Sequence, residues 1–157
     1  MKYLTIAAYL LLAPVAFAET VHIKNNTGGD PYGFYDQIKA FRKSGAKVII
    51  SGKCSSSCAL YLHKEADIDV CVNKSAEIGF HSAYKLTEHG ILDTSEHAKR
   101  VSHLINQIIY NGMPRSVQRK VGTPQKWPSV YNGARHNDAT WIKGPDLKAF
   151  RICEDNE

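Results

Sequence analysis

A serine and a histidine with complementary chemistry, Ser56 and His81, each follow a short apolar run that predicts a β-strand. In a parallel sheet the ends of these strands can lie side by side, which would bring the hydroxyl and the imidazole together. An imidazole can take the proton of a serine hydroxyl, because its ordinary pKa lies near neutral pH. The pattern indicates a nucleophilic serine, although the same serines read alone are more typical of a helix N-cap.

Backbone donors are expected beside Ser56. The chain there leaves a buried strand and continues best as a helix, whose first N–H groups are unpaired and could bind an oxyanion. Gly28-Gly29 forms an earlier strand-to-helix turn at the same edge, where glycine lets a backbone N–H approach a ligand closely. The amides of Gly29 and Ser57 would together form a two-donor oxyanion hole.

Other polar candidates favour structural roles. Lys53 suggests a Ser–Lys dyad, but its position next to the turn should direct its side chain away. The remaining histidines show no metal-binding spacing, and Trp127 and Trp141 suit core or loop anchors. We therefore expect no metal and no cofactor.

The elements that position these residues alternate between strand and helix, which predicts an α/β fold with a largely parallel sheet. Asp30 as N-cap, Pro31 and Ser44-Gly45 delimit a first helix, and the clearest helix has an apolar stripe of Val101, Leu104, Ile105, Ile108 and Ile109. Strands are predicted at 21–24, 46–51, 69–72, 77–80 and 150–153, helices at 94–111, 115–122 and 145–149, and mostly loop at 123–137.

The first eighteen residues predict a secretory signal peptide. Lys2 precedes a short apolar core, and Ala16-Phe17-Ala18 forms a cleavage site. Cleavage would leave one domain, residues 19–157, with no membrane span and a periplasmic or secreted location. The net charge of +5 comes from scattered residues, which favours a solvated surface over nucleic-acid binding.

Four cysteines, Cys54, Cys58, Cys71 and Cys153, lie in the predicted mature chain. In an exported protein an even number indicates two disulfides, and four cysteines allow three pairings. A zinc site made by Cys54, Cys58 and Cys71 is the alternative.

Three motifs in order resemble those of the Clp-type serine protease subunit (ClpP) in the crotonase-like superfamily. They are Asn26-Thr27-Gly28-Gly29, Gly52-x-x-x-Ser56-x-x-Ala59 and Ile78-Gly79-Phe80-His81. The Cys-x-Ser-x-Cys form resembles secreted ClpP-like bacterial proteins more closely. The resemblance covers about residues 21–85 and implies a ClpP/crotonase-like fold.

Carried over to this chain, the resemblance implies that Ser56 is the nucleophile and His81 the general base, with oxyanion donors at Gly29 and Ser57. The third triad member would be Asp138, with Asn137 or Asp146 as alternatives, because the alignment needs an insertion there. The strands that this family places side by side favour the disulfide Cys54–Cys71, which leaves Cys58–Cys153. The chain departs from the family at Cys54 and Cys58, where small residues are usual.

The function expected from this resemblance is an exported serine peptidase that cleaves peptides through an acyl-enzyme. A catalytically inactive binding or assembly module of the same fold is the main alternative, since folds do not fix function. A crotonase-type acyl-CoA enzyme is disfavoured, because acyl-CoA is a cytoplasmic substrate. We expect a peptide or protein substrate, a small homo-oligomer or trimer at most, and no ATP-dependent unfoldase.

Overall fold

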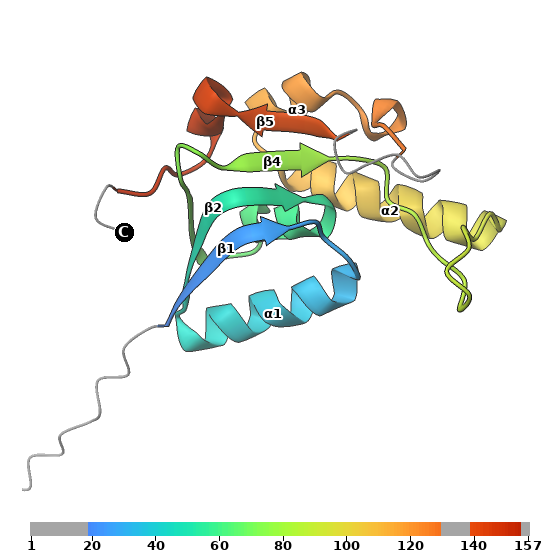
Figure 1. Cartoon of the computed structure of the whole chain (residues 1–157), viewed down its shortest axis with the longest axis horizontal. Coiled ribbons are helices and arrows are strands. Elements are labelled where there is room, and N and C mark those ends of the chain that lie inside the picture. Colours follow the sequence, from blue (N-terminus) through green and yellow to red (C-terminus); the bar gives the residue numbers. More distant parts are fainter. Residues whose placement is uncertain (1–18, 130–138, 155–157) are drawn as a thin grey trace, which may run out of the picture.

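The computed structural model describes residues 19–129 and 139–154, and their centre is a mostly parallel sheet (Figure 1). Its strands run in the order β1-β2-β4-β5, and β3 pairs with the first half of β2. All pairings are parallel except that of β4 with β5. The predicted α/β class with a largely parallel sheet is therefore confirmed. The strands are β1 Thr20–Asn26, β2 Lys47–Ser55, β3 Asp69–Val72, β4 Glu77–Phe80 and β5 Thr140–Lys143.

The helices begin and end where local signals place them. Asp30 accepts a hydrogen bond from the amide of Tyr32 at the start of the first helix, and Gly45 ends that helix with a φ of 68°. Ser95 caps the second long helix through the amide of Ala98. The helices are α1 Pro31–Ser44, α2 Glu96–Gly112 and α3 Arg115–Val121, with 3₁₀ segments η1 Ser56–Leu62, η2 Pro124–Lys126 and η4 Gly144–Ala149.

One main core joins the helices to a single face of the sheet. Val48 and Ile50 of β2 are fully buried in it, together with apolar residues of α1, η1, α2 and α3. Ile49, which alternates to the opposite face, belongs instead to a small cluster with Cys71 and Cys153. The sheet is thus covered by helices on one face and, at this cluster, by the C-terminal segment on the other.

Three expected elements differ from the structure. The strand predicted at 46–51 continues to Ser55, and it enters a 3₁₀ segment in place of an α-helix. Thr140–Lys143 forms a strand that was not expected, while the strand predicted at 150–153 is reduced to one bridge between Val72 and Ile152. Short segments such as these have little periodicity of their own, so their state depends on the strand beside them.

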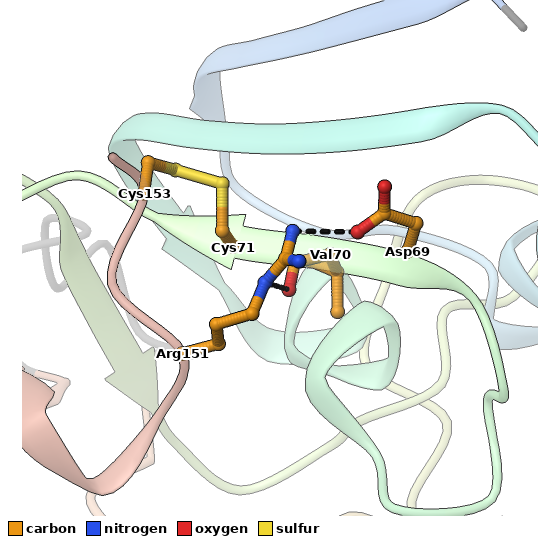
Figure 2. Close-up of a disulfide and its surroundings, with 5 residues drawn as sticks. All are labelled: Asp69, Val70, Cys71, Arg151 and Cys153. Carbon is orange, nitrogen blue, oxygen red and sulfur yellow. Dashed lines mark hydrogen bonds and ion pairs between the residues drawn. A yellow bond between two sulfur atoms is a disulfide. The ribbon is translucent and has the colours of Figure 1, made fainter. Parts of the chain in front are cut away.

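The four cysteines form two disulfides, as predicted, but both predicted pairings are wrong. The bonds are Cys54–Cys58 and Cys71–Cys153 (Figure 2). In the register of β2 and β3, Cys71 lies opposite Ile49, so Cys54 is five residues further along the strand. That is about 16 Å at the usual rise per residue, too far for a disulfide.

Cys153 reaches Cys71 because the C-terminal segment runs beside β3. The amide of Cys153 donates to the carbonyl of Val72 at 3.0 Å. Arg151 donates to the carbonyl of Val70 at 3.2 Å and pairs with Asp69 at 2.5 Å, as Figure 2 shows.

The zinc alternative is also excluded. Cys54, Cys58 and Cys71 are all bonded to another cysteine and therefore offer no thiolate. Within the described ranges, 19–129 and 139–154, no helix is both long enough and apolar enough to cross a membrane. The signal peptide predicted for residues 1–18 lies outside those ranges.

Candidate functional site

The register of the sheet aligns the glycine turn, the serine turn and the histidine. Asn26 of β1 pairs with Cys54 of β2, and Cys54 pairs with Ile78 of β4. Two residues beyond this row the chain reaches Gly28 after β1 and Ser56 after β2, and three residues beyond it His81 after β4. Parallel pairing therefore brings all three to the carboxyl-end edge of the sheet, as the sequence predicts.

Ser56 lies at the sharpest point of its turn. Its φ is +58°, in the left-handed region that residues other than glycine rarely adopt. Gly28 makes room for it, because a Cβ added to Gly28 would lie 2.6 Å from Cβ of Ser56 and 2.8 Å from the carbonyl oxygen of Ser55. Strained backbone of this kind is frequent at functional sites, where the surroundings hold it in place.

A direct hydrogen bond ties the serine turn to the glycine turn. The hydroxyl of Ser57 donates to the carbonyl oxygen of Gly29 at 2.8 Å. Gly28 is held from the other side, where its amide donates to the side chain of Asn26 at 2.9 Å. The two turns that carry the predicted oxyanion donors are thus fixed relative to each other.

His81 is 6% exposed and is held in a defined orientation. Its Nδ1 lies 3.0 Å from the carbonyl oxygen of Ser82. A carbonyl oxygen only accepts, so this contact is a hydrogen bond only when Nδ1 carries the proton. The neutral ring then has its lone pair on Nε2, which is the form that a general base requires.

The segment after His81 is anchored on two sides. Ser82 donates through its amide to Pro128 at 2.9 Å and through its hydroxyl to Trp127 at 3.1 Å. The amide of Ala83 donates to the side chain of Asn106, which is 7% exposed, at 2.8 Å. The sequence does not single out Asn106, because Ser102 and His103 lie one turn before it and Gln107 beside it is another amide.

A cleft of about 590 Å³ opens over these residues. The N-terminus of α1 forms one wall and the first half of α2 the opposite wall. The segment after His81 forms the rim, and the exposed Tyr32 and Tyr84 stand beside it. The lining residues are Thr27–Tyr32, Ser56, Ser57, His81, Ala83–Leu86, His97, Val101, Ser102 and Ile105.

The residues predicted to form one apolar stripe on α2 do not all face the core. Val101 and Ile105 face the cleft, Ile109 is buried in the core, and Leu104 is 59% exposed. Some apolar residues of α2 therefore pack in the core and others line the cleft, whereas Leu104 is exposed to solvent.

A small polar cluster closes the rim between the segment after His81 and α2. The carboxylate of Asp93 accepts from the amide of Ser95 at 3.0 Å and lies 3.9 Å from the ammonium of Lys85. Hydrogen bonds from the side chain and backbone of Ser95 lower the pKa of Asp93, and the nearby ammonium of Lys85 acts in the same direction.

Two of the three residues predicted for the third triad position lie outside the described residues. Asp138 and its alternative Asn137 lie outside the described ranges. Asp146, the other alternative, lies 3.2 Å from Lys120 and does not line the cleft. Lys53 does not line the cleft, and its ammonium lies 5.8 Å from the ring centre of Trp141.

No protein-family model matches this chain, and no curated protein does. The case for a function therefore depends on the site itself.

Proposed function

We propose that this protein is an exported serine hydrolase of ClpP/crotonase-like fold that cleaves peptides through an acyl-enzyme. One observation carries the proposal. Ser56, in a left-handed turn, and His81, oriented through Nδ1, line the same cleft as the paired glycines Gly28 and Gly29. An activated serine needs a neighbouring base, and the base needs a group that orients it.

In the proposed first step, Nε2 of His81 takes the hydroxyl proton as Oγ of Ser56 attacks the peptide carbonyl carbon. The amides of Gly29 and Ser57 stabilise the resulting oxyanion. The intermediate then expels the amine, which receives the proton from His81. Water, deprotonated by the same histidine, hydrolyses the ester and restores Ser56.

Asp138 is proposed as the third triad member. It precedes β5, whose first residue, Thr140, pairs with Phe80 directly before His81. The carbonyl of Ser82 already orients Nδ1, so Asp138 would mainly stabilise the protonated imidazole. Loss of Asp138 should therefore cost less activity than loss of His81.

The cleft favours an extended peptide with an apolar side chain next to the scissile bond. Val101 and Ile105 offer an apolar wall, and Leu86 and the tyrosines Tyr32 and Tyr84 extend apolar surface outward. Two disulfides are compatible with a secreted protein, so we place the substrate outside the cytoplasm. No ATP-dependent unfoldase is expected there.

Labelling with a fluorophosphonate tests the proposal on purified protein without residues 1–18. The labelled peptide, located by mass spectrometry, should carry the label on Ser56. Label should be lost in Ser56→Ala and fall by about 10³-fold or more in His81→Ala, because triad members act as a unit.

Ser55→Ala is the matched control, since Ser55 is a buried strand residue next to the nucleophile. It should keep most of the labelling rate, whereas Ser57→Ala should lose part of it with the bond to Gly29. Label on Ser55 or Ser57 would refute the assignment of Ser56. No label on folded, disulfide-bonded protein would favour the binding-module alternative.

A further inference from the structure

One disulfide encloses the proposed nucleophile. Cys54, near the end of β2, and Cys58, in η1, are bonded to each other with Ser56 midway between them. Both cysteines are fully buried, and neither lines the cleft. The bridge is therefore next to the site without contacting a substrate there.

The bridge connects the turn to the central strand β2 of the sheet. Cys54 is paired on both sides, with Asn26 of β1 and with Ile78 of β4. Cys58 has no such strand partners, and the disulfide gives η1 a covalent link to β2. The backbone between the two cysteines must therefore complete its turn within three residues.

That short span includes the left-handed φ of Ser56. A serine free of restraint leaves this region for more favourable backbone conformations. Packing against Gly28 and the bond from Ser57 to Gly29 oppose such relaxation from the cleft side. The disulfide opposes it from the core side, because it limits how far Cys54 and Cys58 can separate.

We propose that Cys54 and Cys58 are positioning residues, whose disulfide holds Ser56 in the attacking conformation and the amide of Ser57 at the oxyanion. The kinetic part of this inference rests on the proposed function. It also implies that the protein would reach full activity only after this disulfide has formed during oxidative folding.

The test compares two double variants with wild type. Cys54→Ala/Cys58→Ala removes the bridge around Ser56, and Cys71→Ala/Cys153→Ala, the matched control, removes the bridge shown in Figure 2. Fluorophosphonate labelling gives the maximal rate constant and the inhibitor constant separately. Amide hydrogen exchange of peptides that cover 52–60 and 69–73 reports on the serine turn and on β3, respectively, without any need for activity.

In Cys54→Ala/Cys58→Ala we expect the maximal labelling rate to fall by about tenfold or more, since small misplacements of reacting groups have effects of that size. The inhibitor constant should change by about twofold or less, because the cleft walls are untouched. Exchange should rise in 52–60 and stay near wild type in 69–73. In the control variant, exchange should rise in 69–73 and stay near wild type in 52–60. As long as this variant is folded, its labelling rate should equal that of wild type.

Wild-type labelling kinetics in Cys54→Ala/Cys58→Ala would overturn the inference, and so would unchanged exchange over 52–60. A variant that fails to fold would also overturn it, because the bridge would then serve the fold and not the turn. If wild type itself takes no label, the proposed function fails, while the exchange comparison still decides whether the bridge holds the turn.

Discussion

Ser56 and Gly28 form a pair in which each residue's conformation depends on the other. The left-handed φ of Ser56 moves its Cβ towards the glycine turn, and Gly28, with a φ of +85°, brings no side chain to that place. Holding a residue other than glycine in this region costs about 1–2 kcal/mol, which the surrounding contacts must offset.

Gly28→Ala should therefore both destabilise the protein and slow the labelling of Ser56. The new Cβ would meet Cβ of Ser56 at 2.6 Å and the carbonyl of Ser55 at 2.8 Å, so one of the two turns must shift. We expect a loss of about 1–3 kcal/mol in unfolding free energy, measured by denaturant titration. Labelling should fall by about tenfold or more.

Gly45→Ala controls for backbone strain alone. Gly45 has a φ of 68° at the end of α1, and a Cβ there has no heavy atom within 4 Å. This variant should lose about 1 kcal/mol and keep the labelling rate. Equal labelling rates in Gly28→Ala and wild type would show that the contact with Ser56 does not govern the site.

At the scale of elements, the rim of the cleft is a small hairpin between β4 and α2, with a bridge from Leu86 to Leu92. Figure 1 shows this segment extending past the sheet beside the start of α2. At the base of this hairpin, Asp93 pairs with Lys85 on the opposite arm and accepts a hydrogen bond from the amide of Ser95, the N-cap of α2. The negative charge of the Asp93 carboxylate therefore strengthens the contacts between this hairpin and the start of α2.

The pKa of Asp93 is lowered in the folded protein, chiefly by hydrogen bonds from Ser95, and this predicts a pH-dependent contribution to stability. The contribution is present above the ordinary carboxyl pKa of about 3.9 and is lost as the pH falls through the lower, folded-state value. Asp93→Asn should melt below wild type at neutral pH, and the two melting temperatures should converge at acidic pH.

Asp36→Asn is the matched control, because Asp36 forms an exposed pair with Lys39 within α1. Such pairs contribute little to stability, so this variant should follow wild type more closely at neutral pH. A melting-temperature difference between Asp93→Asn and wild type that does not shrink on acidification would contradict the role given to the carboxylate.

At the scale of the whole molecule, the two disulfides close loops of very different length. Cys71 and Cys153 are 82 residues apart, whereas Cys54 and Cys58 are separated by four. In the chain-entropy account, such loops stabilise the fold by about 4.5 kcal/mol and about 2 kcal/mol, respectively. The long bridge therefore suits a role in overall stability, and the short bridge a local role.

The small number of exposed apolar residues on α2 favours a small oligomer over a large one. Leu104 on α2 and Ile91 in the rim hairpin are 59% and 62% exposed, but α2 uses Val101 and Ile105 for the cleft and Ile109 for the core. Little apolar surface on α2 is left for a large assembly. We expect light scattering of the mature protein to give a mass of three subunits or fewer, or of a small ring.

Leu104→Glu tests whether this surface takes part. If the protein is oligomeric, the substitution should lower its mass, while Lys99→Glu on an exposed position of the same helix should not. A mass corresponding to a large double ring would show the expectation to be wrong.

Local chemistry was sufficient to determine several features of this protein from its sequence. Asp30 and Gly45 delimit α1 through contacts within a few residues, and short apolar runs, alternating in β1, indicate β1, β2, β3 and β4. The positions of Ser56 and His81 at strand ends followed from the same patterns. These features depend on neighbours in the chain, which the sequence displays directly.

Other features were decided by contacts between distant segments. The register of β2 against β1, β3 and β4 separated Cys54 from Cys71 and so determined the cysteine pairs. β5 is a strand because β4 offers it a free edge, and Ser56 is left-handed where the turn meets Gly28. Short segments gain too little from local interactions to offset their conformational entropy, so their structure depends on the tertiary contacts that surround them.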